Sequence, residues 1–472
     1  MTTTLVVGCR TSEGPISPTT SRTTGPTTSR TTGPKTGSEG PAKGKAPLVS
    51  DTCSEVPEYG LPDPERPRYR LAIEIKPEQG VVEGRQHVRF VPDQVVDRLV
   101  FRLWANGPRP TAAGAHLEVT GTQVDGRIAE LQGPTSDPTT LVIPLEGSVR
   151  AGKAIEVDMT WHLTLPGPSR DRLARQGDAM RLGSFFPLLA WEPGVGWALE
   201  PPTTRLAEAG TSPVADFTLE VTHPDDLTVL ASGVHEGGDR WRAEAMRDIA
   251  LSIGRFRVAT AVAHVPEPAT ITVGVHEGLD DDPNRYLQRI VSAIEDFSRR
   301  YGAYPYTTYT VALTPGLTGG IEYPGFAMQG PETYGRSTPH EVAHQWFYAL
   351  VGNNQGRDPW LDEGPATWAE ARFEGTLPAF VGKVIPPEAV GQTTRPMSWW
   401  DGHGDAYYRG VYVQPAQAFA ALGDPEAVDC ALRRYVATNA FKIARPDDLS
   451  VALESVSPGA GATLAAFGIG AR

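Results

Sequence analysis

The chain has 472 residues, which favours two or three domains over one. Its formal charge of −13 argues against a partner held by phosphate neutralisation, so we expect no nucleic-acid partner. Glycine (50 residues) and proline (43 residues) are both above ordinary usage and predict many turns or a linker. The sequence has no apolar run of about 18 residues, so it predicts no membrane-spanning helix.

Residues 1–50 are expected to be a lipoprotein leader followed by a disordered linker. Residues 5–9 read Leu-Val-Val-Gly-Cys and resemble the lipobox at which bacterial lipoproteins are cut and lipidated, here on Cys9. The apolar stretch is shorter than the roughly 7 to 15 residues of a signal peptide, so an N-terminus without a signal is the alternative. Residues 19–34 repeat Thr-Thr-Ser-Arg-Thr-Thr-Gly-Pro twice, a composition typical of a solvated tether.

The three cysteines bear on where the protein works. If Cys9 carries lipid, the protein is exported and meets a membrane only through that anchor; without the signal it is cytoplasmic. Cys53 and Cys430 could then form a disulfide in an oxidising exterior. The sequence indicates no oligomeric state.

The first folded part is expected to be rich in β-strands. Apolar and polar residues alternate in short segments separated by Gly, Pro and Asp. The segments are 69–75, 86–90, 99–104 and 155–161, with further short runs at 217–221 and 249–256. We place a β-rich N-terminal domain at residues 51–262.

Residues 263–472 have a different pattern and are expected to form a second, mainly helical domain, which makes the whole a multidomain α+β fold. Apolar residues spaced by three and four predict a helix over 284–301, ended by Gly302 and Pro305. Residues 306–313, rich in Thr, Tyr and Val, predict a strand. From about residue 338 onward the pattern is mostly helical.

Residues 340–344 read His-Glu-Val-Ala-His. On a helix this spacing puts His340 and His344 on one face, where both imidazoles can bind one Zn²⁺, and Glu341 can reach a water at the metal. The apolar residues that follow predict that this helix continues to residue 351. Its opposing face consists of Val342, Ala343, Trp346, Phe347, Leu350 and Val351.

A catalytic zinc needs a third protein ligand and an open position for water. The segment Trp-Leu-Asp-Glu-Gly at 360–364 offers Glu363, nineteen residues after His344. Alone, Glu363 could equally be an acid at the start of a helix, ahead of Pro365, where the helix dipole favours it.

Together His340, Glu341, His344 and Glu363 resemble the gluzincin signature, and residues 340–368 are similar to the membrane alanine aminopeptidase family of zinc metallopeptidases. This resemblance implies a β-rich N-terminal domain followed by a thermolysin-like catalytic domain with one Zn²⁺ per chain. It also implies a short form without the helical C-terminal domain of many relatives, and therefore a more open cleft between the two domains.

The resemblance extends to a substrate-binding element. Gly319-Gly-Ile-Glu-Tyr323 is similar to the family's Gly-x-Met-Glu-Asn element, which implies that Glu322 binds the free α-amine of the substrate. Gly319 and Gly320 belong to the same element. Ile321 and Tyr323 replace Met and Asn, which leaves the preferred side chain open. The alternative is that Glu322 is an ordinary loop acid.

Two further positions follow from the family pattern. The family has a Tyr before an x-Lys-Gly or x-Arg-Gly step, whose hydroxyl stabilises the oxyanion, and in residues 406–410 this is Tyr407. Tyr408 and Tyr412 are rivals, and either could be a packing aromatic. Glu370 matches a family acid that contacts a zinc-binding histidine. The alternative is that Glu370 lies on the solvated face of a helix.

The function implied by the resemblance is a zinc-dependent aminopeptidase acting on peptides with a free N-terminus, with Glu341 as the general base. Two alternatives stay open. One is a thermolysin-like endopeptidase, and the other is an inactive peptidase scaffold that acts as a binding protein.

Overall fold

The computed structural model describes residue 53 and residues 56–131, 137–206 and 210–470. The predicted leader and linker, including Cys9, lie outside these residues. The described residues belong to one compact unit. No helix within the described ranges is long and apolar enough to cross a membrane.

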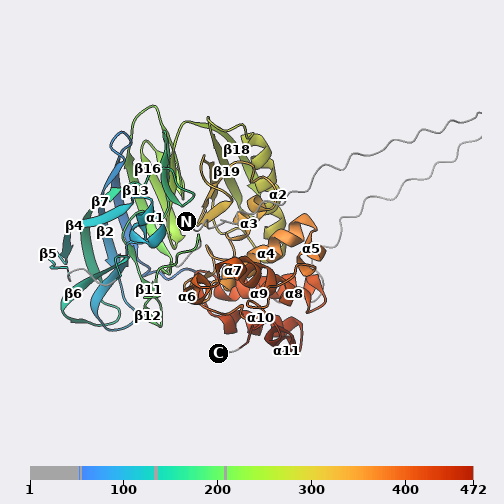
Figure 1. The fold of residues 1–472 in the computed structure, drawn as a ribbon. Coiled ribbons are helices and arrows are strands. Elements are labelled where there is room, and N and C mark those ends of the chain that lie inside the picture. Colours follow the sequence, from blue (N-terminus) through green and yellow to red (C-terminus); the bar gives the residue numbers. More distant parts are fainter. Residues whose placement is uncertain (1–52, 54–55, 132–136, 207–209, 471–472) are drawn as a thin grey trace, which may run out of the picture. The chain divides into compact units, whose positions relative to one another are not determined.

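The first part of the described chain is built from β-sheets, drawn blue to green in Figure 1. Its largest sheet has eight strands in the order β15-β16-β13-β1-β2-β7-β4-β5. The strands are β1 (Arg68–Lys76), β2 (Val81–Phe90), β4 (His116–Val124), β5 (Arg127–Ile128), β7 (Ile155–Thr164), β13 (Ala215–Thr222), β15 (Val234–Gly237) and β16 (Arg240–Met246). Burial alternates strictly along β1, because successive side chains point to opposite faces of a sheet.

Three smaller sheets complete this part. Their strands are β3 (Val96–Arg102), β6 (Thr140–Val149) and β10 (Leu188–Leu189); β11 (Trp191–Glu192) and β12 (Gly196–Trp197); and β8 (Leu173–Gln176), β9 (Ala179–Leu182), β14 (Thr228–Ala231) and β17 (Leu251–Gly254). The short helices η2 (Trp104–Asn106) and α1 (Pro108–Ala112) follow β3. One predicted run is wrong: residues 249–256 are not one strand, because the chain leaves β17 at Arg255 and enters a different sheet.

That sheet has five strands in the order β18-β19-β20-β22-β21. The strands are β18 (Phe256–His264), β19 (Pro268–His276), β20 (Thr308–Leu313), β21 (Gly320–Tyr323) and β22 (Phe326–Gln329). Strand β21 lies at the edge, paired with β22 alone among the described strands. The predicted domain boundary at residue 262 falls within β18 and stays a prediction.

Helix α2 (Pro283–Tyr301) packs beside this sheet and confirms the helix predicted over 284–301 (Figure 1). The Asp282 side chain accepts a hydrogen bond from the Asn284 backbone N–H and caps the first turn. Gly302, with φ of 104°, ends the helix. The strand predicted at 306–313 is present from Thr308.

The remainder is mainly helical, drawn orange to red in Figure 1. Its elements are α3 (Ser337–Ala343), β23 (Gly352–Asn353), α4 (Trp360–Glu374), α5 (Leu377–Val381), α6 (Met397–Asp401), α7 (Gly404–Tyr407), the π-helix η3 (Tyr408–Val413), α8 (Gln414–Ala420), α9 (Pro425–Asn439), β24 (Ile443–Ala444), α10 (Pro446–Val456) and α11 (Ala460–Ala465). The predicted order, a β-rich part followed by a helical part, is confirmed.

The helix predicted to run from the His-Glu-Val-Ala-His segment to residue 351 is shorter than expected, since α3 ends at Ala343. After it, the N–H groups of Ala349 and Leu350 bond to carbonyls five residues earlier instead of four. The guanidinium of Arg247, from the β-rich part, donates to the carbonyls of Tyr348, Ala349 and Leu350, which a longer helix would need for its own ladder.

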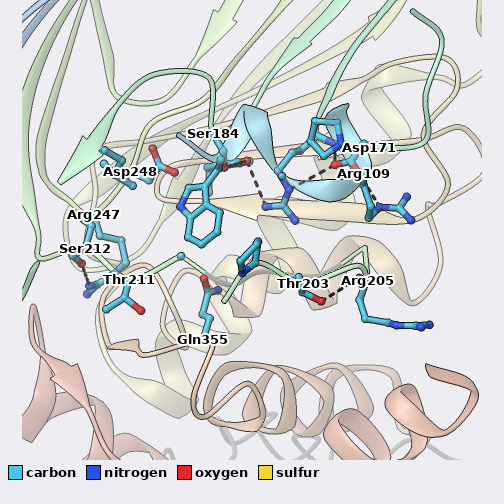
Figure 2. Close-up of a pocket in the computed structure, with 18 of the residues that line it drawn as sticks. Arg109, Asp171, Ser184, Thr203, Arg205, Thr211, Ser212, Arg247, Asp248 and Gln355 are labelled. Atoms are coloured by element: carbon cyan, nitrogen blue, oxygen red, sulfur yellow. Dashed lines mark hydrogen bonds and ion pairs between the residues drawn. The ribbon is translucent and has the colours of Figure 1, made fainter. Parts of the chain in front are cut away.

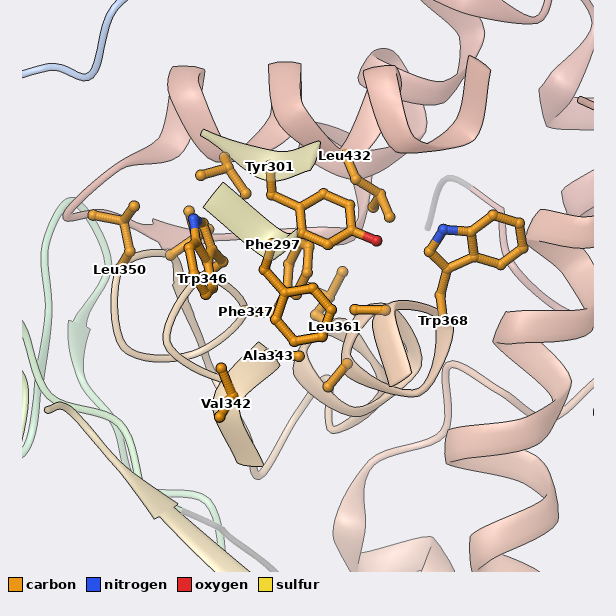
Figure 3. Packing of buried hydrophobic residues seen from close by; sticks show 14 of the residues in the cluster. Phe297, Tyr301, Val342, Ala343, Trp346, Phe347, Leu350, Leu361, Trp368 and Leu432 are labelled. Carbon is orange, nitrogen blue, oxygen red and sulfur yellow. The ribbon is translucent and has the colours of Figure 1, made fainter. Parts of the chain in front are cut away.

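The apolar residues of this segment are nevertheless buried, as predicted. Figure 3 shows them packed between α2, α4 and α9. The ring centroids of Phe297 and Trp346 lie 5.9 Å apart, and those of Tyr301 and Phe347 lie 5.2 Å apart. Burying a large apolar side chain stabilises the fold by about 1.5 to 3 kcal/mol, so these contacts hold the segment after α3 against α2.

A disulfide joins Cys53 to Cys430 on α9, with Cα atoms 5.4 Å apart, and bears out the expected pairing. A second contact lies close by, where the Tyr59 hydroxyl donates to the Ala303 carbonyl at 2.9 Å. The segment ahead of the β-rich part is therefore held on the helical part.

Removing this cross-link by Cys53→Ser together with Cys430→Ser should lower the free energy of unfolding by about 2 to 4 kcal/mol, because the disulfide restricts the unfolded chain. Denaturant unfolding without reductant measures this. Cys9→Ser is the matched control, since Cys9 is the remaining cysteine of the three. Equal stability of the double variant and the control would contradict the prediction.

Candidate active site

Three side chains converge between α3 and α4. His340 lies on α3, His344 follows its last turn, and Glu363 lies in the first turn of α4. The two Nε2 atoms are 3.2 Å apart, and Glu363 Oε2 lies 3.1 Å from His340 Nε2 and 3.4 Å from His344 Nε2. Ligands at 2.0 to 2.1 Å from a tetrahedral Zn²⁺ are separated by about 3.3 to 3.4 Å, so these donors fit the metal.

The charges at this site fit a cation. Burial would lower the pKa of His340, but its hydrogen bonds to Glu363 and Glu370 outweigh burial and raise that pKa above its usual value. Burial would raise the pKa of Glu363, but hydrogen bonds to both imidazoles hold it well below its usual range. A buried carboxylate beside two imidazoles is a nitrogen and oxygen donor set typical of zinc.

The outer atoms of the same residues have partners that fix their orientation. Glu370 Oε2 lies 3.3 Å from His340 Nδ1, and His344 Nδ1 donates to the Phe347 carbonyl at 3.0 Å. Both contacts leave Nε2 directed at the centre of the site. Glu370 is 3% exposed, so the solvated-face alternative is wrong.

Two more acids lie at the site, Glu322 on the edge strand β21 and Glu341 on α3. One donor atom each of Glu322, Glu341 and His344 lie within 4.8 Å of one another, and all three residues are buried. Glu322 lies on a strand, which argues against the alternative of a loop acid. A Cβ on Gly320 would lie 2.4 Å from the Glu341 carboxyl group, so only glycine allows this approach. Gly319 precedes it with φ of 90°.

The three candidate tyrosines differ in the contacts that they make around the site. The Tyr412 hydroxyl donates to Glu363 Oε1, and its ring stacks on His340 with centroids 5.8 Å apart. Tyr407 is buried, and its ring contacts that of Tyr412 at 5.7 Å. Tyr408 accepts a hydrogen bond from Arg336 at 3.0 Å. Tyr412 therefore contacts two of the predicted zinc ligands, Glu363 and His340.

The sequence motif around Gly410 does not indicate this contact of Tyr412. The residue lies in the π-helix η3, whose wider turn changes which side chains share a face. The sequence signal for a π-helix is weak, while the spacing from Gly410 pointed to Tyr407. The assignment of Tyr407 stays a prediction.

An arginine that no sequence motif indicates holds the loop before β21. Arg181 on β9 is 2% exposed and donates to the Pro315 carbonyl at 2.6 Å and to Thr314 Oγ1 at 3.2 Å. Burial lowers the pKa of this guanidinium to about 10. Because β9 is buried at every position, its pattern carried no signal for this residue.

The other face of β21 borders a pocket that is lined by residues of the β-rich and helical parts (Figure 2). Tyr323 lines it, with its hydroxyl 3.3 Å from Ser184 Oγ. Arg109 and Asp171 form an ion pair at 2.9 Å in the same pocket. Burial raises the pKa of Asp248, which also lines it, to about 7.

Comparison with solved structures places this arrangement in a known fold. An M1 zinc metallopeptidase from Deinococcus radiodurans has a TM-score of 0.63 at 19% identity, covering 89% of this chain and 98% of that one. A mutant of that enzyme bound to a Tyr-Ser-Ala substrate has a TM-score of 0.62 at 21% identity, covering 86% and 95%. The chain has the fold of the M1 zinc metallopeptidases. The predicted resemblance to a family of zinc metallopeptidases is therefore confirmed for the fold.

Sequence comparison agrees over a shorter span. Leucine aminopeptidase 2 of Phaeosphaeria nodorum is 24% identical over 288 residues, or 55% of this chain and 45% of the relative. Leucine aminopeptidase 2 of Aspergillus fumigatus is 23% identical over 305 residues, or 55% and 44%. The chain thus spans less than half the length of these curated relatives. No family model matches it.

Proposed function

We propose that the chain is a zinc-dependent aminopeptidase that removes the N-terminal residue from peptides. The observation that carries this proposal is the buried Glu322 carboxylate, which lies within 4.8 Å of Glu341 and His344. A free α-amine is the substrate group that such a carboxylate pairs with. The leucine aminopeptidases among the relatives and the Tyr-Ser-Ala complex among the neighbours support the same chemistry.

His340, His344 and Glu363 would hold the metal. Bound there, Zn²⁺ would supply a Lewis acid and lower the pKa of water from 15.7 towards about 7. Glu341, buried beside His344, takes a proton from the attacking water and delivers it to the leaving amine. Tyr407 or Tyr412 donates a hydrogen bond to the developing oxyanion.

Glu322 determines which bond is cut. A substrate ammonium paired with this carboxylate places the first peptide bond beside Glu341. Strand β21 is an edge strand, and an extended peptide can pair with such an edge. The proposal includes the domain organisation. A β-rich domain at 51–262 precedes a thermolysin-like catalytic domain at 263–472.

The two alternatives are less well supported. An endopeptidase has no use for an amine-binding acid, so Glu322 argues against it. An inactive scaffold would be expected to lack a metal ligand or the base, and His340, His344, Glu363 and Glu341 are all in place.

We also propose that the protein is exported. The disulfide between Cys53 and Cys430 supports this, since disulfides persist in oxidising compartments. Attachment through lipid on Cys9 is part of the same proposal, and the mass of the native protein tests it.

Glu341→Gln should lower kcat for an aminoacyl-coumarin by about 10²-fold to 10⁴-fold, because the amide cannot accept the proton from water. Zinc content should stay at one per chain, measured by metal analysis. Glu388→Gln, at an exposed position, is the matched control. A chelator should abolish hydrolysis by the unaltered protein. Undiminished turnover by zinc-loaded Glu341→Gln would refute the role of the base.

Glu322→Gln should raise KM for peptides with a free N-terminus and lower kcat/KM by about 10²-fold, since a buried charge partner of the ammonium is lost. The measurement compares each peptide with its N-acetylated form. If the unaltered protein cleaves both forms equally well, it is an endopeptidase and not an aminopeptidase.

The tyrosines can be separated by comparing two variants. Tyr412→Phe should weaken zinc binding by about 10-fold to 100-fold, because its hydroxyl holds the Glu363 carboxylate. Tyr407→Phe should lower kcat with zinc affinity retained. Chelator competition and turnover measure the two effects. A loss of kcat confined to Tyr412→Phe, with normal zinc affinity, would assign the oxyanion role to Tyr412 instead.

A further inference from the structure

Three cationic side chains gather beside the zinc-binding residues, and we call Arg336, Lys383 and Arg409 the cationic cluster. Arg336 Nη2 and Lys383 Nζ lie 3.0 Å and 3.3 Å from the Tyr408 hydroxyl oxygen. The Arg409 guanidinium lies 5.8 Å from the Tyr408 ring centroid. The Phe380 ring is shared, with Arg336 at 4.7 Å and Lys383 at 4.1 Å from its centroid.

The cluster reaches the active site through Glu370. Arg336 donates to Glu370 Oε1, while Glu370 Oε2 lies 3.3 Å from His340 Nδ1. The path from the proposed zinc position through these contacts is therefore about 12 Å at most, taking a Zn–N bond of about 2.0 to 2.1 Å. The Arg336 side chain is 46% exposed, so a ligand from solvent can reach it.

The cluster draws on three separate elements. Arg336 directly precedes α3, Lys383 follows α5, and Arg409 lies in η3. One cation would be enough to orient Glu370, and like charges repel when they are brought together. Three cations at one place are therefore better explained by an anionic ligand than by support of Glu370 alone.

The position of the cluster matches the path of a bound peptide. Along β21, Glu322 lies near both Glu341 and His344, while Gly320, two residues earlier, lies against Glu341, the one of these two nearer the start of α3. A peptide held by its amine at Glu322 therefore extends along α3 towards its first residue. Arg336 lies at that end, one turn before His340.

We propose that the cationic cluster binds the C-terminal carboxylate of a short peptide, so that the preferred substrates are tripeptides and tetrapeptides. This inference rests on the proposed aminopeptidase function. An extended chain spans about 3.3 to 3.6 Å per residue, so two or three residues beyond the cleaved bond cover roughly 7 to 11 Å. That reach falls within the upper bound of about 12 Å for the separation of the zinc position and Arg336.

The direct test is binding to the zinc-loaded Glu341→Gln variant, which leaves the peptide intact. Calorimetry compares the tripeptide Leu-Gly-Gly with Leu-Gly-Gly amide, which differ only in the C-terminal charge. We expect the free acid to bind about tenfold more tightly, as one charge-assisted contact implies. The advantage should shrink as salt is added.

Two variants assign the effect to the cluster. In the same background, Lys383→Gln and Arg409→Gln should each reduce the ratio of acid to amide affinity by about threefold or more, as expected for the loss of a partly exposed charge. Because both affinities are measured on one variant, a general loss of binding cancels in the ratio. Lys153→Gln, in an exposed turn, is the control and should keep the ratio. Circular dichroism checks that each variant is folded.

Each outcome decides something. Equal affinity for acid and amide, with normal aminoacyl-coumarin hydrolysis by the unaltered protein, overturns the inference and leaves the proposed function intact. An unchanged ratio in both folded variants places the carboxylate site elsewhere and also overturns it. Failure of the zinc-loaded unaltered protein to cleave any of these substrates refutes the proposed function itself.

Discussion

Two imidazoles and one carboxylate are held with their donor atoms 3.1 to 3.4 Å apart at the candidate active site. These groups come from two helices that begin about twenty residues apart in the sequence. Only dense packing can hold their separation to a fraction of an ångström. The apolar cluster of Figure 3 supplies that packing, since it contains residues of both α3 and α4. The site is thus as rigid as the core beneath it.

The β-rich part contributes to this rigidity through two buried arginines. Arg247 donates to carbonyls of the segment after His344, and Arg181 donates to the loop that leads into β21. Their partners are mostly backbone carbonyls, whose positions are fixed by the chain itself. Arginine suits this task because its planar donors can reach several acceptors at once. The β-rich part therefore helps to position both the proposed metal ligands and β21, which carries the proposed amine-binding Glu322.

The sequence predicts those parts of the site whose residues lie near one another in the chain, and it does not predict contacts between residues that are far apart in the sequence. The spacing of His340 and His344 is set by one helical turn, and the family pattern added Glu363 and Glu322. The end of α3 was not predictable, because it depends on Arg247, which lies about a hundred residues earlier and makes its contacts only in the folded chain. The contact of Tyr412 depends on a π-helix that periodicity of 3.6 residues does not describe.

The disulfide belongs to the same network of constraints. Cys430 follows Asp429, a buried carboxylate on α9 that accepts hydrogen bonds from Trp368 Nε1 at 2.8 Å and from the Tyr301 hydroxyl at 3.2 Å. Trp368 lies on α4, five residues after the proposed metal ligand Glu363. Because Asp429 joins α2, α4 and α9, a cross-link at Cys430 limits the motion of the helix that carries Glu363. The disulfide is thus linked to the active site through Asp429 and Trp368, although Cys53 is distant from Glu363 in the sequence.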